Sequence, residues 1–344
     1  MTCSYSDNRF SGKITRRTLL VDALVAAGIG TAGALVREQI RHRRHRTKVF
    51  IAKAASYRVD LASIVEAGLR NLGIGPAQVR GRKILLKPNF VETLRGAIHI
   101  CTQPELIFGA ADAFRKLGAA SVLIGEGPGH CRDTSRVIDE VRLAESLVEQ
   151  KTQFVDLNND DLIVRPNAGG RNGLQTLTLP ATVDQVDWIV SMPKMKTHHW
   201  VGVTLSMKNL FGMMPGIVYG WPKNIFHWVG IERSILDVNE TVRPHLAIVD
   251  GIVGMEGDGP IMGTPKPTGV IVMGANLPAV DATAARIMGI DPAKVSYLKS
   301  AHDRLGTIAR EDISQRGEAI ASVRTEYQLM DFIPAHQGLR PART

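Results

Sequence analysis

One short segment holds most of the side chains in this sequence that could bind or react with a charged ligand. Residues 193–212 read PKMKTHHWVGVTLSMKNLFG and contain three lysines and two adjacent histidines. Ammonium and amide groups suit an anion, and a histidine can move a proton near neutral pH. The candidate ligand-binding residues are Lys194, Lys196, Lys208 and Asn209, and the candidate proton-transfer residues are His198 and His199. The alternative is a solvated cationic surface.

Two other short motifs carry similar groups. Lys87 and Asn89 place an ammonium and a carboxamide beside Pro88, an arrangement that suits a carboxylate or a phosphate. The run GEGPGH at 125–130 presents Glu126 in a tight glycine-rich loop, but it lacks the spacing of a dinucleotide-binding fingerprint. We therefore expect Lys87 and Asn89 to bind substrate and Glu126 to act in proton transfer.

A third motif concentrates carboxylates on a stiff backbone. Residues 248–267 read IVDGIVGMEGDGPIMGTPKP, with five glycines and three prolines around Asp250, Glu256 and Asp258. Carboxylates held in this way serve as general acids or bases, or as ligands for a hard metal ion. We take Glu256 as a candidate catalytic residue. Asp250 and Asp258 are candidate ligands of a divalent metal, the cofactor that the sequence leaves open.

Alternating strand and helix patterns position these motifs. Near-continuous apolar strands between helical segments predict an α/β fold with a mainly parallel, helix-covered sheet, and leave room for a smaller α+β subdomain. Ligands of such sheets bind beyond the carboxyl ends of the strands, where these motifs fall. The predicted strands include 48–54, 82–89, 245–251 and a strand that enters a glycine-rich loop at 121–130. The predicted helices are 60–73, 104–119, 201–212, 229–240, 278–288 and 294–304.

The net charge of +9 comes mostly from the N-terminus. Residues 1–48 hold ten lysines and arginines against three acids, which leaves only +2 for the remaining 296 residues. Aromatic residues make up 5% of the chain and do not interleave with basic runs. This distribution argues against a nucleic-acid partner.

The N-terminal segment resembles an export signal. Arg16 and Arg17 precede the weakly apolar run 19–36, as in signals of the twin-arginine pathway. We expect a leader and basic linker at 1–47, the main domain at 48–305 and a C-terminal extension at 306–344. This predicts a contact with the twin-arginine translocon and a place in the periplasm or cell envelope. An uncleaved N-terminal anchor and a cytosolic extension are the alternatives.

The cysteines exclude a metal cluster built by this chain alone. Cys3, Cys101 and Cys131 are too few for a four-cysteine iron–sulfur or zinc site. In an oxidising compartment Cys101 and Cys131 could form a disulfide. The alternative is two separate core residues.

Five motifs follow one another along the chain, namely KPNF, GEGPG, PKMKTHHWVGVTLSMKNLFGMMPG, IVDGIVGMEGDGPIMGTP and ANLPAVDATAARIMGIDP. In this order they resemble the family catalogued as domain of unknown function 362. The resemblance covers about residues 48–305 and implies an α/β domain whose activity is not established. Other members are often joined to cysteine-rich ferredoxin modules. This chain lacks those cysteines, so we expect no iron–sulfur cluster of its own, and a redox partner protein would have to supply one.

Together these features predict an exported enzyme that acts on an anionic small molecule through lysines, histidines and carboxylates. A redox-linked reaction is suggested only by the resemblance and the export signal. The alternative is a module without catalysis that binds an anionic ligand or cofactor and delivers it to a partner. The sequence does not choose between an enzyme and a binding module.

Overall fold

The computed structural model describes residues 46–92, 94–130 and 132–342. The chain divides between Arg46 and Thr47, and every helix and strand of the description lies in the unit that begins at Thr47. The predicted leader and Cys131 lie outside the described residues. Cys101 is a buried free thiol. In the described part of the chain, no helix combines the length and the apolar character needed to span a bilayer.

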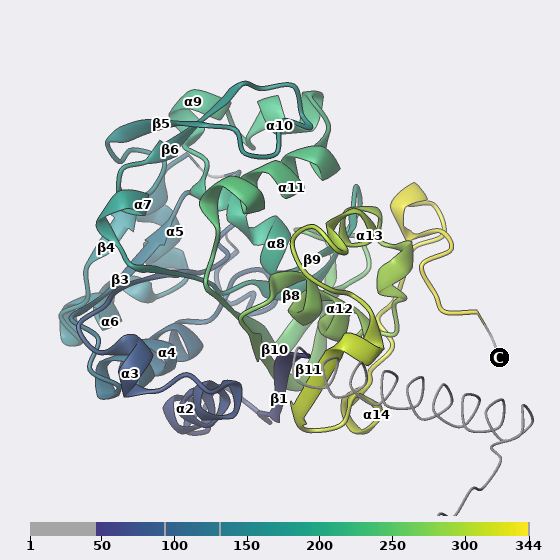
Figure 1. Cartoon of the computed structure of the whole chain (residues 1–344), viewed down its shortest axis with the longest axis horizontal. Helices are drawn as coiled ribbons and strands as arrows, with labels where there is room; N and C mark the ends of the chain where they lie inside the picture. The colour runs from purple at the N-terminus through teal and green to yellow at the C-terminus, as the bar shows by residue number, and fades with distance from the viewer. Residues whose placement is uncertain (1–45, 93, 131, 343–344) are drawn as a thin grey trace, which may run out of the picture. The chain divides into compact units, whose positions relative to one another are not determined.

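A single large sheet forms the centre of this unit (Figure 1). Strands β10, β7, β2, β3 and β4 run parallel to one another, whereas β11 is antiparallel to both of its neighbours. This confirms the predicted α/β fold with a mainly parallel sheet. In spatial order the strands are β12 (Ile313–Gly317), β1 (Thr47–Lys53), β11 (Thr264–Gly274), β10 (Leu246–Glu256), β7 (Trp188–Ser191), β2 (Lys83–Lys87), β3 (Ser121–Glu126) and β4 (Phe154–Asp156).

Helices cover both faces of the sheet because its strands bury apolar side chains alternately to either side. In β1, Val49 and Ile51 enter one core and Phe50 enters the other. One face carries α2 (Leu61–Leu72), α4 (Pro104–Lys116), α5 (Thr134–Glu140) and α6 (Leu143–Glu149). The other face carries α8 (Ser206–Asn209), α11 (Ile231–Val242), α12 (Leu277–Ile287) and α13 (Ser296–Ala301).

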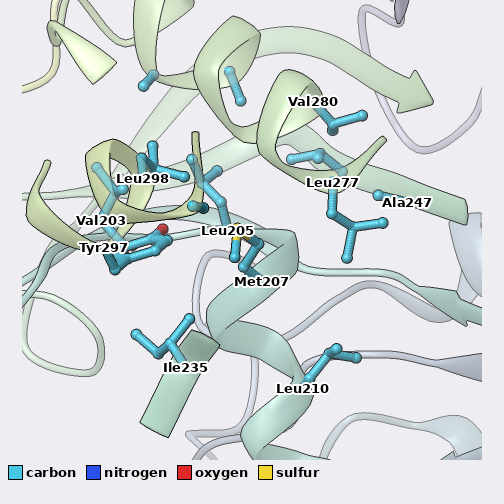
Figure 2. Packing of buried hydrophobic residues seen from close by; sticks show 14 of the residues in the cluster. Val203, Leu205, Met207, Leu210, Ile235, Ala247, Leu277, Val280, Tyr297 and Leu298 are labelled. Atoms are coloured by element: carbon cyan, nitrogen blue, oxygen red, sulfur yellow. Dashed lines mark hydrogen bonds between the residues drawn. The ribbon is translucent and has the colours of Figure 1, made fainter. Parts of the chain in front are cut away.

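The core on the face with α8, α11, α12 and α13 contains the apolar neighbours of Lys208 and Asn209. Figure 2 shows Leu205 and Met207 packed among side chains of α12 and α13, with Ile235 of α11 nearby. Asp281 of α12 fastens the start of α8, because its carboxylate accepts hydrogen bonds from the backbone N–H groups of Ser206 and Met207 at 2.8 and 3.0 Å. Lys208 and Asn209 therefore project from a short helix that is fixed on two sides.

The prediction of one helix over 201–212 was wrong. The chain there forms β8 (Lys194–His198) and β9 (Gly202–Thr204), an antiparallel pair, and only then α8 and a 3-10 helix at Leu210–Met213. The β-branched residues of 201–204 favour extended backbone, and Gly202 takes a left-handed φ of 80° that interrupts a helix. The sequence patterns did not indicate strand β8, which is buried along its whole length and pairs with β10.

A two-stranded antiparallel sheet lies apart from the main one, formed by β5 (Leu162–Pro166) and β6 (Thr176–Pro180). It lies beside α9 (Gly216–Tyr219), α10 (Asn224–Trp228) and α11 (Figure 1), and Tyr219 Oη accepts from Thr178 N at 2.6 Å. Strand β12 of the predicted C-terminal extension joins the main sheet beside β1. The remaining short helices are α3 (Pro76–Val79), α7 (Thr182–Gln185) and α14 (Ile320–Val323), with 3-10 turns at Pro292–Lys294, Arg310–Asp312 and Pro334–His336.

Candidate functional site

A cavity of about 260 Å³ opens beyond the carboxyl ends of β2 and β3, where the sequence predicts a ligand crevice. Strand β8, helix α8 and helix α10 also contribute to its wall. Seven of the predicted site residues line it, namely Lys87, Asn89, Glu126, His198, His199, Lys208 and Asn209. The polar side chains that complete the lining are His130, Thr204, Lys223 and His227.

A buried ion pair forms the floor of this cavity. Lys87 Nζ donates to Glu126 Oε2 at 2.7 Å, to Asn209 Oδ1 at 3.0 Å and to Pro88 O at 2.6 Å. An ammonium has three donors, so all of them are used. Both side chains of the pair are almost completely buried, at 1% and 2% exposure. Lys87 therefore contributes charge to the cavity but has no free hydrogen-bond donor for a ligand.

Glu126 is held as a counter-ion. Its carboxylate accepts from Phe90 N at 3.0 Å and Gly127 N at 2.9 Å in addition to Lys87. These three donors fix the position of the carboxylate at the floor of the cavity. The proton-transfer role expected of Glu126 stays a prediction.

Gly212 makes room for the ion pair. A methyl group on its Cα would overlap Glu126 Oε1 and come within 2.5 Å of Lys87 Nζ. We expect Gly212→Ala to lower the free energy of unfolding by about 1–3 kcal/mol, the usual cost of overpacking. Gly129→Ala is the matched control, because the nearest heavy atom to its added carbon would be Val91 Cγ1 at 4.0 Å. Urea denaturation measures both, and equal losses would contradict the steric role.

Two further lysines contribute cations that are not neutralised within the cavity. In the described part of the chain, Lys208 Nζ has no hydrogen-bond partner, and it lies 4.0 Å from the ring centroid of Phe211. Burial, with Lys196 and Lys87 nearby, lowers the pKa of Lys208 to about 7. Burial also lowers the pKa of Lys223 to about 7, although its amine donates to Asn158 Oδ1. Near pH 7 both amines are therefore only partly protonated, and a bound anion would favour the protonated form of each.

Two histidines of the cavity have opposite tautomers. His198 Nδ1 accepts from Trp200 N at 3.0 Å, which leaves its proton on Nε2 as a donor. His227 Nδ1 lies 3.1 Å from Lys223 O, which can only accept, so its Nε2 is left as a base. Burial first and Lys208 second lower the pKa of His227 to about 4 and that of His198 well below its usual value. Both imidazoles are neutral at pH 7.

His199 lies at the rim. Its Nδ1 is 3.4 Å from Asp258 Oδ1, and both side chains are partly exposed. Its ring also makes an edge contact with Trp200, whose centroid is 4.7 Å away. Of the adjacent pair, His198 therefore belongs to the buried interior and His199 to the entrance.

Two polar atoms in the cavity wall have no partner among the described residues. They are Asn89 Oδ1 and Thr204 Oγ1, on side chains that are only 5% and 2% exposed as whole residues. Burying a polar atom without a hydrogen-bond partner costs free energy, and such atoms commonly bind a ligand or a water molecule. The predicted helix 201–212 would place Thr204 and Lys208 one turn apart, whereas Thr204 ends β9 and Lys208 lies in α8, yet both residues line the cavity.

The other predicted site residues lie outside this cavity. Lys194 Nζ pairs with Asp250 Oδ2 at 2.6 Å, both side chains are fully buried, and Tyr57 Oη donates to Asp250 Oδ1 at 2.8 Å. Lys196 Nζ donates to Ile100 O at 2.9 Å and Pro260 O at 3.1 Å. The Lys194–Asp250 pair is thus a separate buried network, and Lys196 ties the cavity wall together.

The predicted carboxylate cluster is also divided. Glu256 pairs with Lys266 at 3.0 Å and accepts from Gln328 N, whereas Asp250 and Asp258 have the separate partners Lys194 and His199. The described ranges contain no group of three or more histidine, cysteine, aspartate or glutamate side chains placed to hold a metal ion. Asp250 and Asp258 therefore have different partners, and a divalent metal bound by these two residues stays a prediction.

The cavity lies entirely within a stretch that matches a known family. Residues 84–286 match the model described as "Domain of unknown function (DUF362)", which covers more than half of the chain. The chain belongs to the DUF362 family. It is also 26% identical over 276 residues to a thylakoid-associated protein of Synechocystis sp., an alignment that covers 75% of this chain and 79% of that protein. The resemblance inferred from the motifs is confirmed.

Sequence reasoning missed His227 and gave no separate role to Lys223 in this DUF362 protein. Both belong to the segment around α10, which follows no strand of the main sheet. The cluster of Trp221, Phe226 and Trp228 around them is the one available signal, because aromatic residues beside basic ones often form ligand pockets. Their approach to the cavity depends on tertiary packing.

Proposed function

We propose that this DUF362 protein is an enzyme that binds a small anionic molecule in the cavity and moves a proton on it. The observation that carries the proposal is the charge of the lining. It contains three lysines and four histidines against a single carboxylate, Glu126, which is already paired with Lys87. Lys208 and Lys223 are left to hold an anion, in a partly apolar site where charge–charge attraction is strong.

The two neutral histidines supply the proton-transfer step. His227 offers an unprotonated nitrogen that can take a proton from the ligand, and the N–H of His198 can donate a hydrogen bond to the negative charge left on the ligand. His199 lies at the entrance of the cavity beside Trp200. In this assignment Lys208 is the main anion-binding residue, Lys223 supports it, and the Lys87–Glu126 pair fixes the floor.

Replacing His227 with asparagine tests the catalytic role. The asparagine amide can still donate to Lys223 O, while the basic Nε2 is lost. For the enzyme we expect turnover to fall by about a hundredfold, as is typical for loss of a general base, with the ligand Kd changed less than threefold. A screen of anionic metabolites by thermal shift would first identify a ligand, and product formation from it would be followed by mass spectrometry.

His198→Asn provides a parallel variant, because its side-chain oxygen can still accept from Trp200 N. Lys266→Met is the control, since Lys266 pairs with Glu256 outside the cavity. If no anion stabilises the full chain, and if Lys208→Met has no more effect than the control on any ligand, the proposal fails.

A module that binds without catalysis is the second candidate. The observation that favours it is Glu126, since the carboxylate of the cavity is locked by three donors and unavailable for chemistry. A binding module would bind the ligand unchanged and show no turnover with either histidine variant or the native chain. A redox reaction with an iron–sulfur partner protein stays a prediction from the family resemblance.

We further propose that the protein acts at a membrane-bounded compartment outside the cytosol. The twin-arginine pair supports this, and so does the name of the thylakoid-associated relative. Changing Arg16 and Arg17 together to lysine is expected to abolish export, because the pathway requires this pair. Arg43→Lys with Arg44→Lys is the matched control in the basic run. Cell fractionation of the full chain measures both, and equal export of the two variants would contradict the proposal.

A further inference from the structure

The size and lining of the cavity narrow the class of ligand. We infer that the ligand is a small aromatic acid that carries a hydroxyl or amino substituent. This inference rests on the proposed function, since it assumes that the cavity binds an anion. The cavity, at about 260 Å³, lies at or below the roughly 300–1,000 Å³ of pockets for drug-sized ligands, so a single substituted ring is a suitable occupant.

Most of the exposed wall area around Lys208 and Lys223 is apolar or aromatic. Phe90, Phe211 and Trp200 line it, and Trp200 also makes an edge contact with His227 at a centroid distance of 4.7 Å. The aliphatic part of the lining comes from Val91, Pro222, Pro260 and Ile261. Aromatic walls favour a flat ring through edge and offset contacts.

The cation end of the cavity fixes where the acid group lies. Lys208 Nζ has no hydrogen-bond partner among the described residues, yet it lies over the ring of Phe211. A carboxylate at this amine would pair with it at the edge of the aromatic wall. The ring attached to that carboxylate would then lie against Phe211 and Trp200.

The substituent follows from the unpartnered Asn89 oxygen. Asn89 Oδ1 can only accept a hydrogen bond, so a second carboxylate oxygen would be repelled there, whereas an O–H or N–H group would be held. Thr204 Oγ1, also unpartnered, can donate to the oxygen of a hydroxyl or accept from an amine. A site that hydrogen-bonds a ligand hydroxyl discriminates strongly against the analogue that lacks it.

The experiment is isothermal titration calorimetry of the full chain at pH 7 with a matched ligand series. The series is acetate, cyclohexanecarboxylate, benzoate, the 3- and 4-hydroxybenzoates, the 3- and 4-aminobenzoates, inorganic phosphate and glycerol phosphate. We expect benzoate to bind more tightly than acetate and cyclohexanecarboxylate. At least one substituted benzoate should bind about tenfold more tightly than benzoate, the range of one buried hydrogen bond.

Asn89→Leu should abolish this tenfold preference while benzoate itself binds within about threefold of the native chain, because the carboxamide is lost and the lysines that hold the carboxylate remain. Asn71→Leu, at an exposed position of α2, is the control. Should Asn89→Leu fail to fold, Thr204→Val gives the same test, since valine keeps the shape and removes the hydroxyl.

The outcomes separate this inference from the proposed function. If phosphate or glycerol phosphate binds and the aromatic acids bind no better than acetate, the aromatic ligand is excluded and the anion site stands. If substituted and plain benzoates bind equally, the role of Asn89 is excluded. If no member of the series binds, this inference fails, and the broader screen of anionic metabolites decides the proposed function.

Discussion

Replacing Lys87 with methionine is expected to lower the free energy of unfolding by about 3–5 kcal/mol, the cost of leaving a buried charge without its partner. The Glu126 carboxylate would remain almost completely enclosed, with its two backbone donors but no cation. Asn209 would also lose the ammonium that its Oδ1 accepts from, although its Nδ2 still donates to Ser191 Oγ at 3.1 Å. Urea denaturation of the full chain measures the loss.

A second substitution distinguishes a broken ion pair from lost packing. Adding Glu126→Gln to Lys87→Met removes the stranded charge, so the double variant should recover part of the stability. Lys53→Met is the surface control, because the Lys53–Glu318 pair at 3.0 Å is 58% and 37% exposed and should contribute little to stability. A loss in Lys87→Met no larger than in Lys53→Met would show that the pair does not hold the floor of the cavity.

Anion affinity is expected to fall steeply as the pH rises above 7. Burial and neighbouring cations lower the pKa values of Lys208 and Lys223 to about 7, so both amines lose their protons just above neutrality. An anion binds the charged amines and must restore each proton as it binds. Affinity should therefore fall by about tenfold per pH unit for each lysine above pH 7, and level off below it. Calorimetry in buffers of different ionisation enthalpy measures the proton uptake directly.

The stability of the free protein should change in the opposite direction. The folded pKa of each lysine lies below its ordinary value of 10.5, so the unfolded chain binds more protons between about pH 7 and that value. The contribution of these lysines to the free energy of unfolding therefore rises with pH across this window. Lys208→Met should remove the contribution of Lys208 to the pH dependence of the anion affinity and of the free energy of unfolding. A pH-independent affinity would exclude the two amines as the anion-binding groups.

The fold follows from apolar periodicity wherever a strand or helix is long and regular. Strands β1, β2 and β3 and helices α2, α4 and α12 lie within a few residues of their predicted ranges, because each has a continuous apolar pattern and clear end signals such as the left-handed Gly73 after α2. The sequence did not indicate strand β8, because Lys194, Lys196 and His198 interrupt the apolar pattern by which a buried strand is recognised. Charged residues in a buried strand are stable only with partners, and these partners come from distant parts of the chain.

The candidate site could be predicted in part for the same reason. Lys87 and Glu126 end neighbouring parallel strands, so their meeting follows from the sheet. The division between the cavity and the Lys194–Asp250 network does not, since it depends on β10 continuing for six residues past Asp250. His227 reaches the cavity only through the packing of α10. Residues placed by sheet topology were thus predictable, and those placed by helix packing were not.

The alternation of side chains along β8 has a consequence for finding distant members of the family. Lys194, Lys196 and His198 are spaced two apart on one strand, so their side chains share one face, while Met195 joins the core on the other. A single inserted or deleted residue would exchange the two faces and place amines in the hydrocarbon interior. Insertions should therefore be absent from this strand even where the flanking loops vary in length. The spacing Lys-x-Lys-x-His should therefore identify family members whose overall sequence similarity to this chain is low.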